Sequence, residues 1–336
     1  MKIEKINIDK IDSYVNSKII LIVCSSYEDR CLSIAQAIDS AKIEKALIAY
    51  NEDIAPYINK NCENLISLFS NKSERVALNT NDPIKTADNL KTYLQANIKS
   101  GCYILVDITT FTHESLLILI KLLDLITEGK SHVKFAYTGA KTYGVVPKKI
   151  LKDKNKTKED ISESIWLSKG IINIRNVLGF SGDIFPLRKT HLIILVGFEY
   201  ERALELIKRY EPNYLSLGFG KAGGSISEKH HQANKKFHSL LTEIASNWQK
   251  VNSFEFSCND PVETQKAIIN QSRIHPDTNV VVAPMNTKIS TLGAYLANKE
   301  NAAIQICYAK PLKYNYENYS TPGDTCYIID LPEIFK

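Results

Sequence analysis

Two distant stretches of the sequence decide the fold. Residues 19–35 read IILIVCSSYEDRCLSIA, and residues 192–206 read LIILVGFEYERALEL. In each stretch an apolar run leads into a short polar segment, an acid and an arginine, so that Arg30 corresponds to Arg202. The apolar runs are typical of buried strands, and the residues that follow have the apolar spacing of a helix. We therefore predict a strand followed by a helix at both places.

The remainder of each half follows the same order. The sequence Asn-Asp-Pro occurs at residues 81–83 and again at 259–261, each time after a strand-like run. Asp is a good N-cap and Pro suits the first helical turn, so both copies predict a helix start. Three further pairs correspond: residues 103–110 with 280–287, residues 133–137 with 303–308, and Asn64 with Asn234. This repeated order predicts an internal duplication, each half reading β-α-β-α-β-α-β-α-β.

The predicted fold class is α/β, with two tandem Rossmann-like parallel-sheet units related by this duplication. Such continuous apolar runs are expected in strands buried on both faces, as in a parallel sheet covered by helices. We place the first unit at residues 1–144 and the second at residues 190–336, which end in a Tyr-rich C-terminal extension. Residues 145–189 are predicted to be a Lys-rich, solvated linker with a connecting helix over 161–178.

The composition predicts a folded cytoplasmic protein. Of the 336 residues, 44% are hydrophobic and 24% are charged, which excludes wholesale disorder. The net charge of +5 allows an anionic ligand, but the charges are interspersed, unlike those of a protein that coats nucleic acid. The seven cysteines form no CxxC pair and the first residues are charged, so we expect reduced thiols, no signal peptide and no metal site. The longest apolar stretch, residues 115–126, is interrupted by Lys121 and Asp124, so we expect no membrane span.

The candidate site residues follow the predicted strands, because ligands of open parallel sheets bind outside the carboxyl ends of the strands. Hydroxyl groups at a helix start, with an arginine one turn into the helix, suit an anionic group. The alternative for these turns is a helix cap with a local salt bridge. The expected ligand-binding residues of the two first turns are Ser25, Ser26, Arg30, Glu199 and Arg202.

Further candidates follow the later strands. Residues 107–110 read DITT, and Thr109 and Thr110 place hydroxyl groups at a strand end where they can bind a nucleotide. Residues 218–225 form a Gly-rich loop whose backbone amides suit a phosphate, although a basic, solvated helix after it is the alternative. The other expected ligand-binding residues are Lys141, Gly220, Lys221, Asn286, Thr287 and Lys288. The candidates for general acid–base catalysis are Glu28, Asp107, His113 and Glu114, with helix capping as the alternative for the last two.

The DITT strand end carries a resemblance to a known family. Residues 105–115, LVDITTFTHES, resemble the fourth-strand motif of CARF-like domains, which are Rossmann-like sensors of cyclic oligonucleotides in bacterial antiviral systems. Two such units in one chain are similar to the SAVED arrangement, in which pseudo-symmetric halves form one ligand pocket. The sequence departs from the family where glycines normally follow the threonine, because Thr110, Phe111 and Thr112 stand there. The resemblance implies a sensor whose output lies in a partner effector protein.

Two functional hypotheses follow. The one we favour is a non-catalytic sensing or interaction module of antiviral defence, with an anionic small molecule such as a nucleotide in a cleft between the two units. Its partner is an effector protein or a second copy of the chain, and it needs no cofactor. The alternative is a hydrolase or glycosidase that acts on a nucleotide or nucleic acid with the acids of the first half. The sequence contains no GxSxG or HExxH motif to support the second hypothesis.

Overall fold

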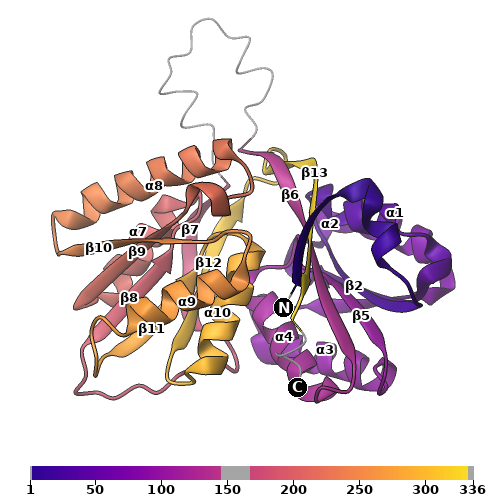
Figure 1. The fold of residues 1–336 in the computed structure, drawn as a ribbon, viewed down its shortest axis with the longest axis horizontal. Coiled ribbons are helices and arrows are strands. Elements are labelled where there is room, and N and C mark those ends of the chain that lie inside the picture. The colour runs from indigo at the N-terminus through magenta and orange to yellow at the C-terminus, as the bar shows by residue number, and fades with distance from the viewer. Residues whose placement is uncertain (1, 145–166, 332–336) are drawn as a thin grey trace, which may run out of the picture. The chain divides into compact units, whose positions relative to one another are not determined.

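The computed structural model describes residues 2–144 and 167–331, which divide into two compact units. Unit 1 contains the described residues before 145 and after 314, and unit 2 is the continuous segment Leu167–Tyr314. Each unit is a β-sheet flanked by helices (Figure 1). The predicted α/β class with two Rossmann-like units is confirmed, whereas the internal duplication stays a prediction.

Unit 1 is built on a seven-stranded sheet of order β1-β13-β6-β5-β2-β3-β4. Strands β2 to β6 are parallel to one another, β13 is antiparallel to β6, and β1 is antiparallel to β13. The strands are β1 (Lys2–Asn7), β2 (Ile19–Ser25), β3 (Ile43–Asn51), β4 (Ser73–Leu78), β5 (Tyr103–Asp107), β6 (His132–Tyr143) and β13 (Ser320–Asp330). The α-helices are α1 (Arg30–Ala37), α2 (Ala55–Phe69), α3 (Pro83–Asn97) and α4 (His113–Thr127).

Unit 2 is built on a six-stranded sheet of order β10-β9-β8-β11-β12-β7. Strands β8 to β12 are parallel, and β7 is antiparallel to β12. The strands are β7 (Ser168–Asn176), β8 (Thr190–Leu195), β9 (Tyr214–Gly220), β10 (Val251–Phe256), β11 (Asn279–Pro284) and β12 (Gln305–Tyr314). The α-helices are α7 (Tyr200–Tyr210), α8 (Glu228–Ser246), α9 (Pro261–Ser272) and α10 (Lys288–Glu300).

The apolar runs of the sequence form the central strands, which are buried in the core of each unit. Every residue of β2 is buried, and so is every residue of β8 after Thr190. In unit 1, α1 packs with α2 over one face of the sheet, and α3 packs with α4. Because helices cover the central strands, these strands are apolar on both sides.

The helix starts follow the capping residues that the sequence predicts. The carboxylate of Asp82 accepts hydrogen bonds from the amides of Ile84 and Lys85, and Pro83 is the first residue of α3. Asp260 caps α9 in the same way. These caps satisfy amide groups that a helix start otherwise leaves unpaired. None of the helices in the two described ranges is long and apolar enough to cross a membrane.

Two antiparallel strands, β7 and β13, differ from the sequence-based expectation. The predicted connecting helix over 161–178 is wrong for Ser168–Asn176, which form β7, since their β-branched isoleucines suit the antiparallel pairing with β12. The Tyr-rich extension does not belong to the second unit, because β13 pairs with β6 and completes unit 1. Both sheets are therefore mixed rather than purely parallel. The lysine-rich residues 145–166 lie outside the described residues.

The chain thus passes between the units twice. After β6 of unit 1 it continues to β7, which pairs with the last parallel strand of unit 2. After β12 of unit 2 it continues to β13, which pairs with the last parallel strand of unit 1. Each unit therefore receives its antiparallel strand from the segment that follows the parallel strands of the other unit.

The turn after β8 depends on a close backbone approach. A Cβ atom at Gly197 would lie 1.9 Å from the carbonyl oxygen of Met285, whereas a Cβ at Gly223 would meet nothing within 4 Å. We predict that Gly197→Ala lowers the free energy of unfolding by about 1–3 kcal/mol, as overpacking does. The control Gly223→Ala is expected to change it by less than about 0.5 kcal/mol. Urea denaturation of both variants measures the difference, and equal midpoints would contradict the prediction.

Candidate functional site

The polar residues that follow the parallel strands gather at the carboxyl edge of each sheet. In unit 1 the strand order changes direction between β2 and β5, and in unit 2 between β8 and β11. Ligand crevices of open α/β sheets lie at such switch points. The turns after β2 and β8 lead into α1 and α7, whose first turns contain Arg30 and Arg202, and both places are built in the same way.

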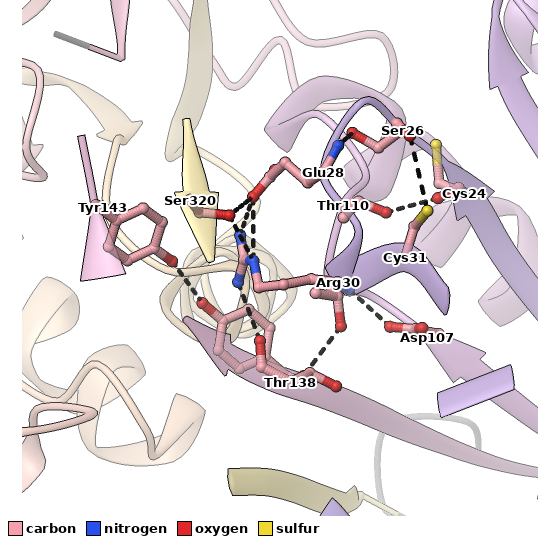
Figure 2. Close-up of polar contacts among 12 residues, drawn as sticks. Cys24, Ser26, Glu28, Arg30, Cys31, Asp107, Thr110, Thr138, Tyr143 and Ser320 are labelled. Atoms are coloured by element: carbon pink, nitrogen blue, oxygen red, sulfur yellow. Dashed lines mark hydrogen bonds and ion pairs between the residues drawn. The ribbon is translucent and has the colours of Figure 1, made fainter. Parts of the chain in front are cut away.

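In unit 1, Arg30 is buried and bonded to groups from three segments (Figure 2). It is 3% exposed, and its Nη2 lies 2.6 Å from Oε2 of Glu28. Its Nη1 donates to the carbonyl oxygen of Thr138 in β6 at 3.0 Å, and its Nε donates to Oγ of Ser320 in β13 at 3.1 Å. Ser320 in turn donates to Glu28, and the Tyr143 ring lies 5.3 Å from the guanidinium carbon. The cluster joins the turn after β2 to β6 and to β13.

Unit 2 contains an equivalent cluster around Arg202, which is 5% exposed. Its Nη1 lies 2.5 Å from Oε2 of Glu199, and its Nη2 donates to the carbonyl oxygen of Ala309 in β12 at 2.7 Å. Ser168, from edge strand β7, donates to Glu199. The two serines also occupy matching register positions, since Ser320 lies opposite Tyr143 and Ser168 lies opposite Tyr314.

These contacts favour the local salt bridge over the anion site at both turns. A buried guanidinium group needs a charge partner and acceptors, and each arginine finds them within its own unit. The acid of each pair is also bonded to a serine of the antiparallel strand beside the last parallel strand. The arginines therefore hold the first strand–helix turn against the far edge of the parallel strands.

The hydroxyl groups expected to bind a ligand in unit 1 also bond within the protein. Thr110 Oγ1 donates to the carbonyl oxygen of Cys24 at 2.6 Å, and Thr109 Oγ1 accepts from the amide of Thr138 at 3.0 Å. Ser25 donates to the carbonyl oxygen of Ile58, and Ser26 accepts from the amide of Glu28. All four residues are buried, so they fix the loops rather than face solvent. Lys141 is exposed near the end of β6.

Among the catalytic candidates, Asp107 has the most clearly shifted pKa. It is 1% exposed at the end of β5, and its Oδ1 accepts from the amide of Thr109 at 3.0 Å. Its Oδ2 has no hydrogen-bond partner among the described residues. Burial raises the pKa of Asp107 to about 7, although the bonds from Thr109 and the charge of Arg30 act in the opposite direction. The carboxyl group therefore titrates near neutral pH.

The other catalytic candidates do not form one solvent-exposed group with Asp107. Glu28 is bonded to Arg30, and Glu114 is buried in the first turn of α4. His113 is the first residue of α4, which Thr112 caps through the amide of Ser115. In the described part of the chain, no group of three or more His, Cys, Asp and Glu side chains is placed to hold a metal ion.

In unit 2, the loops after four parallel strands are joined by hydrogen bonds. The Gly220 amide donates to Oδ1 of Asn234 at 2.7 Å, and the Cys258 amide donates to the carbonyl oxygen of Gly224 at 2.7 Å. Thr287 then donates to the carbonyl oxygen of Cys258. Asn286 and Asn234 both donate to the carbonyl oxygen of Val196, which ties in the turn after β8. Several of the predicted ligand-binding residues thus lie on one connected edge.

Two lysines belong to this edge. Lys221 follows β9 directly and is half-exposed, with its Nζ 2.6 Å from Oε2 of Glu263. Lys288 is the first residue of α10, which Thr287 caps through the amide of Ser290. This edge therefore combines backbone amide groups, a Gly-rich loop and positive charge, which are the components of an anion site.

The sequence did not identify the serines of β7 and β13 or the tyrosines beside the arginines. One signal was present, because Tyr137 and Tyr143 have the same spacing as Tyr308 and Tyr314 and form the same hydroxyl contacts at 3.2 and 3.3 Å. The match of Asn64 with Asn234 is shifted by one helical turn. Asn61, not the exposed Asn64, makes the bond that corresponds to that of Asn234, to a carbonyl of the turn after β2.

No protein-family model and no curated protein matches the chain. Solved structures match it weakly. Spermidine synthase from Thermotoga maritima is 13% identical over 39% of this chain and 42% of its own, with a TM-score of 0.24. The pyocyanin biosynthetic protein PhzM is 10% identical over 51% of both chains, with a TM-score of 0.23. The cytoplasmic domain of a prokaryotic cation chloride cotransporter is 8% identical over 89% of this chain and 98% of its own, with a TM-score of 0.24.

The chain spans about two fifths of the spermidine synthase and about half of PhzM. Likenesses this weak carry no information on ligand or activity.

The buried arginines are expected to stabilise the fold. Arg30→Ala leaves the carboxylate of Glu28 buried without its charge partner, so we predict a loss of about 3–5 kcal/mol in the free energy of unfolding. Arg202→Ala is expected to show a similar loss for unit 2. The double variant Glu28→Leu/Arg30→Met removes both charges and should lose less than Arg30→Ala. Denaturant unfolding of the three variants tests this, with Lys130→Ala, in an exposed pair with Glu128, as the control.

Asp107 is expected to make stability depend on pH. Because its pKa is raised in the folded state, the carboxyl group binds a proton more tightly when folded than when unfolded. Its contribution is therefore complete below the ordinary pKa of an aspartic acid and is lost as the pH rises through about 7. We predict that Asp107→Asn removes a decline on the order of a few kcal/mol between about pH 4 and pH 8. Parallel stability–pH curves for the two proteins would contradict this.

Proposed function

We propose that this protein is a sensor of an anionic nucleotide, which binds at the carboxyl edge of the unit 2 sheet. The observation that carries the proposal is the connected edge of unit 2, where hydrogen bonds join the loops after β8, β9, β10 and β11. Lys221 and Lys288 supply the charge. In the loop after Gly220 the amides of Lys221, Gly224 and Ser225 donate within the protein, and we expect those of Ala222 and Gly223 to meet the ligand. Such an edge is rigid before the ligand arrives, so little ordering is needed on binding.

A non-catalytic role is supported by the state of the acids in unit 1. A general acid or base must come within hydrogen-bond reach of the substrate. Glu28 is buried and bonded to Arg30 and Ser320, and Glu114 is buried in α4. These carboxylates serve the structure of their unit, which favours binding over turnover.

One observation favours a second candidate, a hydrolase that acts on a nucleotide. Asp107 lies at a strand end of the switch point, and its pKa of about 7 suits proton transfer near neutral pH. Its burial requires that the loop at Thr109 and Thr110 opens before a substrate can reach it. The sensor needs no such movement, and for this reason we rank it first.

The resemblance of residues 105–115 to CARF-like domains supports a place in prokaryotic antiviral defence. In that role the output of the sensor comes from an effector protein or from a second copy of the chain. The seven cysteines are free thiols, as a cytoplasmic setting requires.

Ligand binding tests the proposal directly. We predict that native mass spectrometry of the full chain, incubated with pooled mono-, di- and cyclic nucleotides, shows a retained and unchanged nucleotide. Lys221→Ala and Lys288→Ala should each weaken its binding by about 1.5–3 kcal/mol, the range for hydrogen bonds to charged groups. The matched control is Lys250→Ala, because Lys250 is exposed and directly precedes β10, at the opposite end of the strands.

Three other outcomes would contradict the proposal. A nucleotide converted to product would establish the enzyme, and loss of that turnover in Asp107→Asn would place Asp107 in its mechanism. Binding unchanged in both lysine variants would move the anion site elsewhere. If no nucleotide binds, binding of a protein partner would remain as the function.

A further inference from the structure

Three tyrosines from separate segments meet at the carboxyl edge of the unit 1 sheet. Tyr27 lies in the turn after β2, Tyr57 in the first turn of α2, and Tyr316 in the segment that leads into β13. The rings of Tyr57 and Tyr316 stack with centroids 3.9 Å apart and planes 11° apart. Tyr27 meets Tyr316 edge-on at 5.0 Å. Tyr57 is 57% exposed, so this tyrosine platform, Tyr27–Tyr57–Tyr316, presents an aromatic surface to solvent.

Hydrogen-bonding groups lie beside the tyrosine platform. Glu52 and Asp53 form a 3-10 turn between β3 and α2, a few residues before Tyr57. Burial raises the pKa of Tyr316, and Tyr57 and the charge of Asp53 add to the shift. Asn51, the last residue of β3, is 6% exposed, and its amide oxygen has no hydrogen-bond partner among the described residues. A buried, unpaired oxygen at a strand end is consistent with a donor group supplied by a ligand.

The position of Glu52 suits a sugar diol. In nucleotide-binding α/β sheets, an acid at the end of the second parallel strand accepts the ribose hydroxyl groups. Here β3 is the second parallel strand along the chain, it pairs with β2, and Glu52 follows it directly. Asn79 and Lys85 both donate to Oε2 of Glu52, at 3.1 and 3.2 Å. Within the described chain this leaves Oε1 for a hydroxyl group of a ligand.

The same edge is unsuited to phosphate. A phosphate at the first strand–helix turn needs a glycine-rich backbone and no negative charge. The turn after β2 has no glycine and contains Glu28 and the exposed Asp29. Arg30 offers no compensation, since it is buried against Glu28.

We infer that the carboxyl end of β3 in unit 1 is a nucleoside site. The base stacks on Tyr57, and the ribose hydroxyl groups bond to Glu52. Base–aromatic stacking tolerates different bases, so Glu52 and the charge of the edge, rather than the tyrosine platform, select an unphosphorylated riboside. The site shares no residue with the anionic site proposed for unit 2, so each can fail without the other.

Isothermal titration of the full chain with adenosine, guanosine, cytidine and uridine tests the inference. We expect at least one nucleoside to bind, and its 5′-monophosphate to bind more weakly to this site. Tyr57→Ala should weaken nucleoside binding about 5- to 150-fold, the fold-change for the loss of one stacked base, whereas Tyr57→Phe should retain it. Glu52→Gln should abolish the preference for a riboside over its 2′-deoxy form.

The matched control is Tyr103→Ala. Tyr103 is 45% exposed and stacks on His132 at 4.6 Å, but it begins β5 and thus lies at the amino end of the same sheet. Equal weakening by Tyr103→Ala, a riboside preference that survives Glu52→Gln, or no binding of any nucleoside would overturn the inference. Binding of an alkylammonium such as choline in place of every nucleoside would overturn it as well. Lys221→Ala should leave nucleoside affinity unchanged, which separates this site from the one in unit 2.

Discussion

A guanidinium group taken out of water must find an acid and several acceptors inside the protein, and this requirement organises both units. At Arg30 it brings together Glu28 from the same turn, a β6 carbonyl and the hydroxyl of Ser320. No helix or strand could supply this set alone. The first strand–helix turn, the fifth parallel strand and the antiparallel strand β13 are thereby fixed to one another. Removing one partner leaves the other charge buried and unpaired, whereas replacing both partners by apolar residues does not. Such a pair therefore specifies an arrangement more than it adds stability.

The same requirement explains why the arginines are poor ligand-binding residues. A guanidinium group with its charge partner and acceptors in place has little to offer a phosphate. The groups left at the carboxyl edges differ between the units: Glu52, Asp53 and tyrosines in unit 1, and Lys221, Lys288 and a Gly-rich loop in unit 2. Two sheets whose parallel strands have the same order thus present edges of opposite character, and a ligand recognises these edges rather than the fold.

Much of the fold could be predicted from the sequence because its signals are local. The composition of residues 19–25 alone predicts a buried strand. The three residues 81–83, which include Asp82 and Pro83, are enough to predict a helix start. The pairing of β13 with β6 had no such signal, because the sequence of an antiparallel strand does not show which sheet it joins. The role of Arg30 was ambiguous for a related reason. Its neighbour Glu28 is visible in the sequence, but Ser320 is far away along the chain, so the sequence could not decide between a salt bridge and an anion site.

The passage of the chain between the units has a consequence for synthesis on the ribosome. Unit 2 is one continuous segment, and its sheet can close once β12 has emerged from the exit tunnel. Unit 1 is translated first, yet β6 has no edge partner until β13 appears, after the whole of unit 2. Until β13 is synthesised, the first half of the nascent chain therefore has an unpaired strand, β6, at the edge of its sheet. Arg30 also lacks its hydrogen-bond partner Ser320 during this time. Nascent chains usually complete their N-terminal domain first, and in this protein the order is reversed.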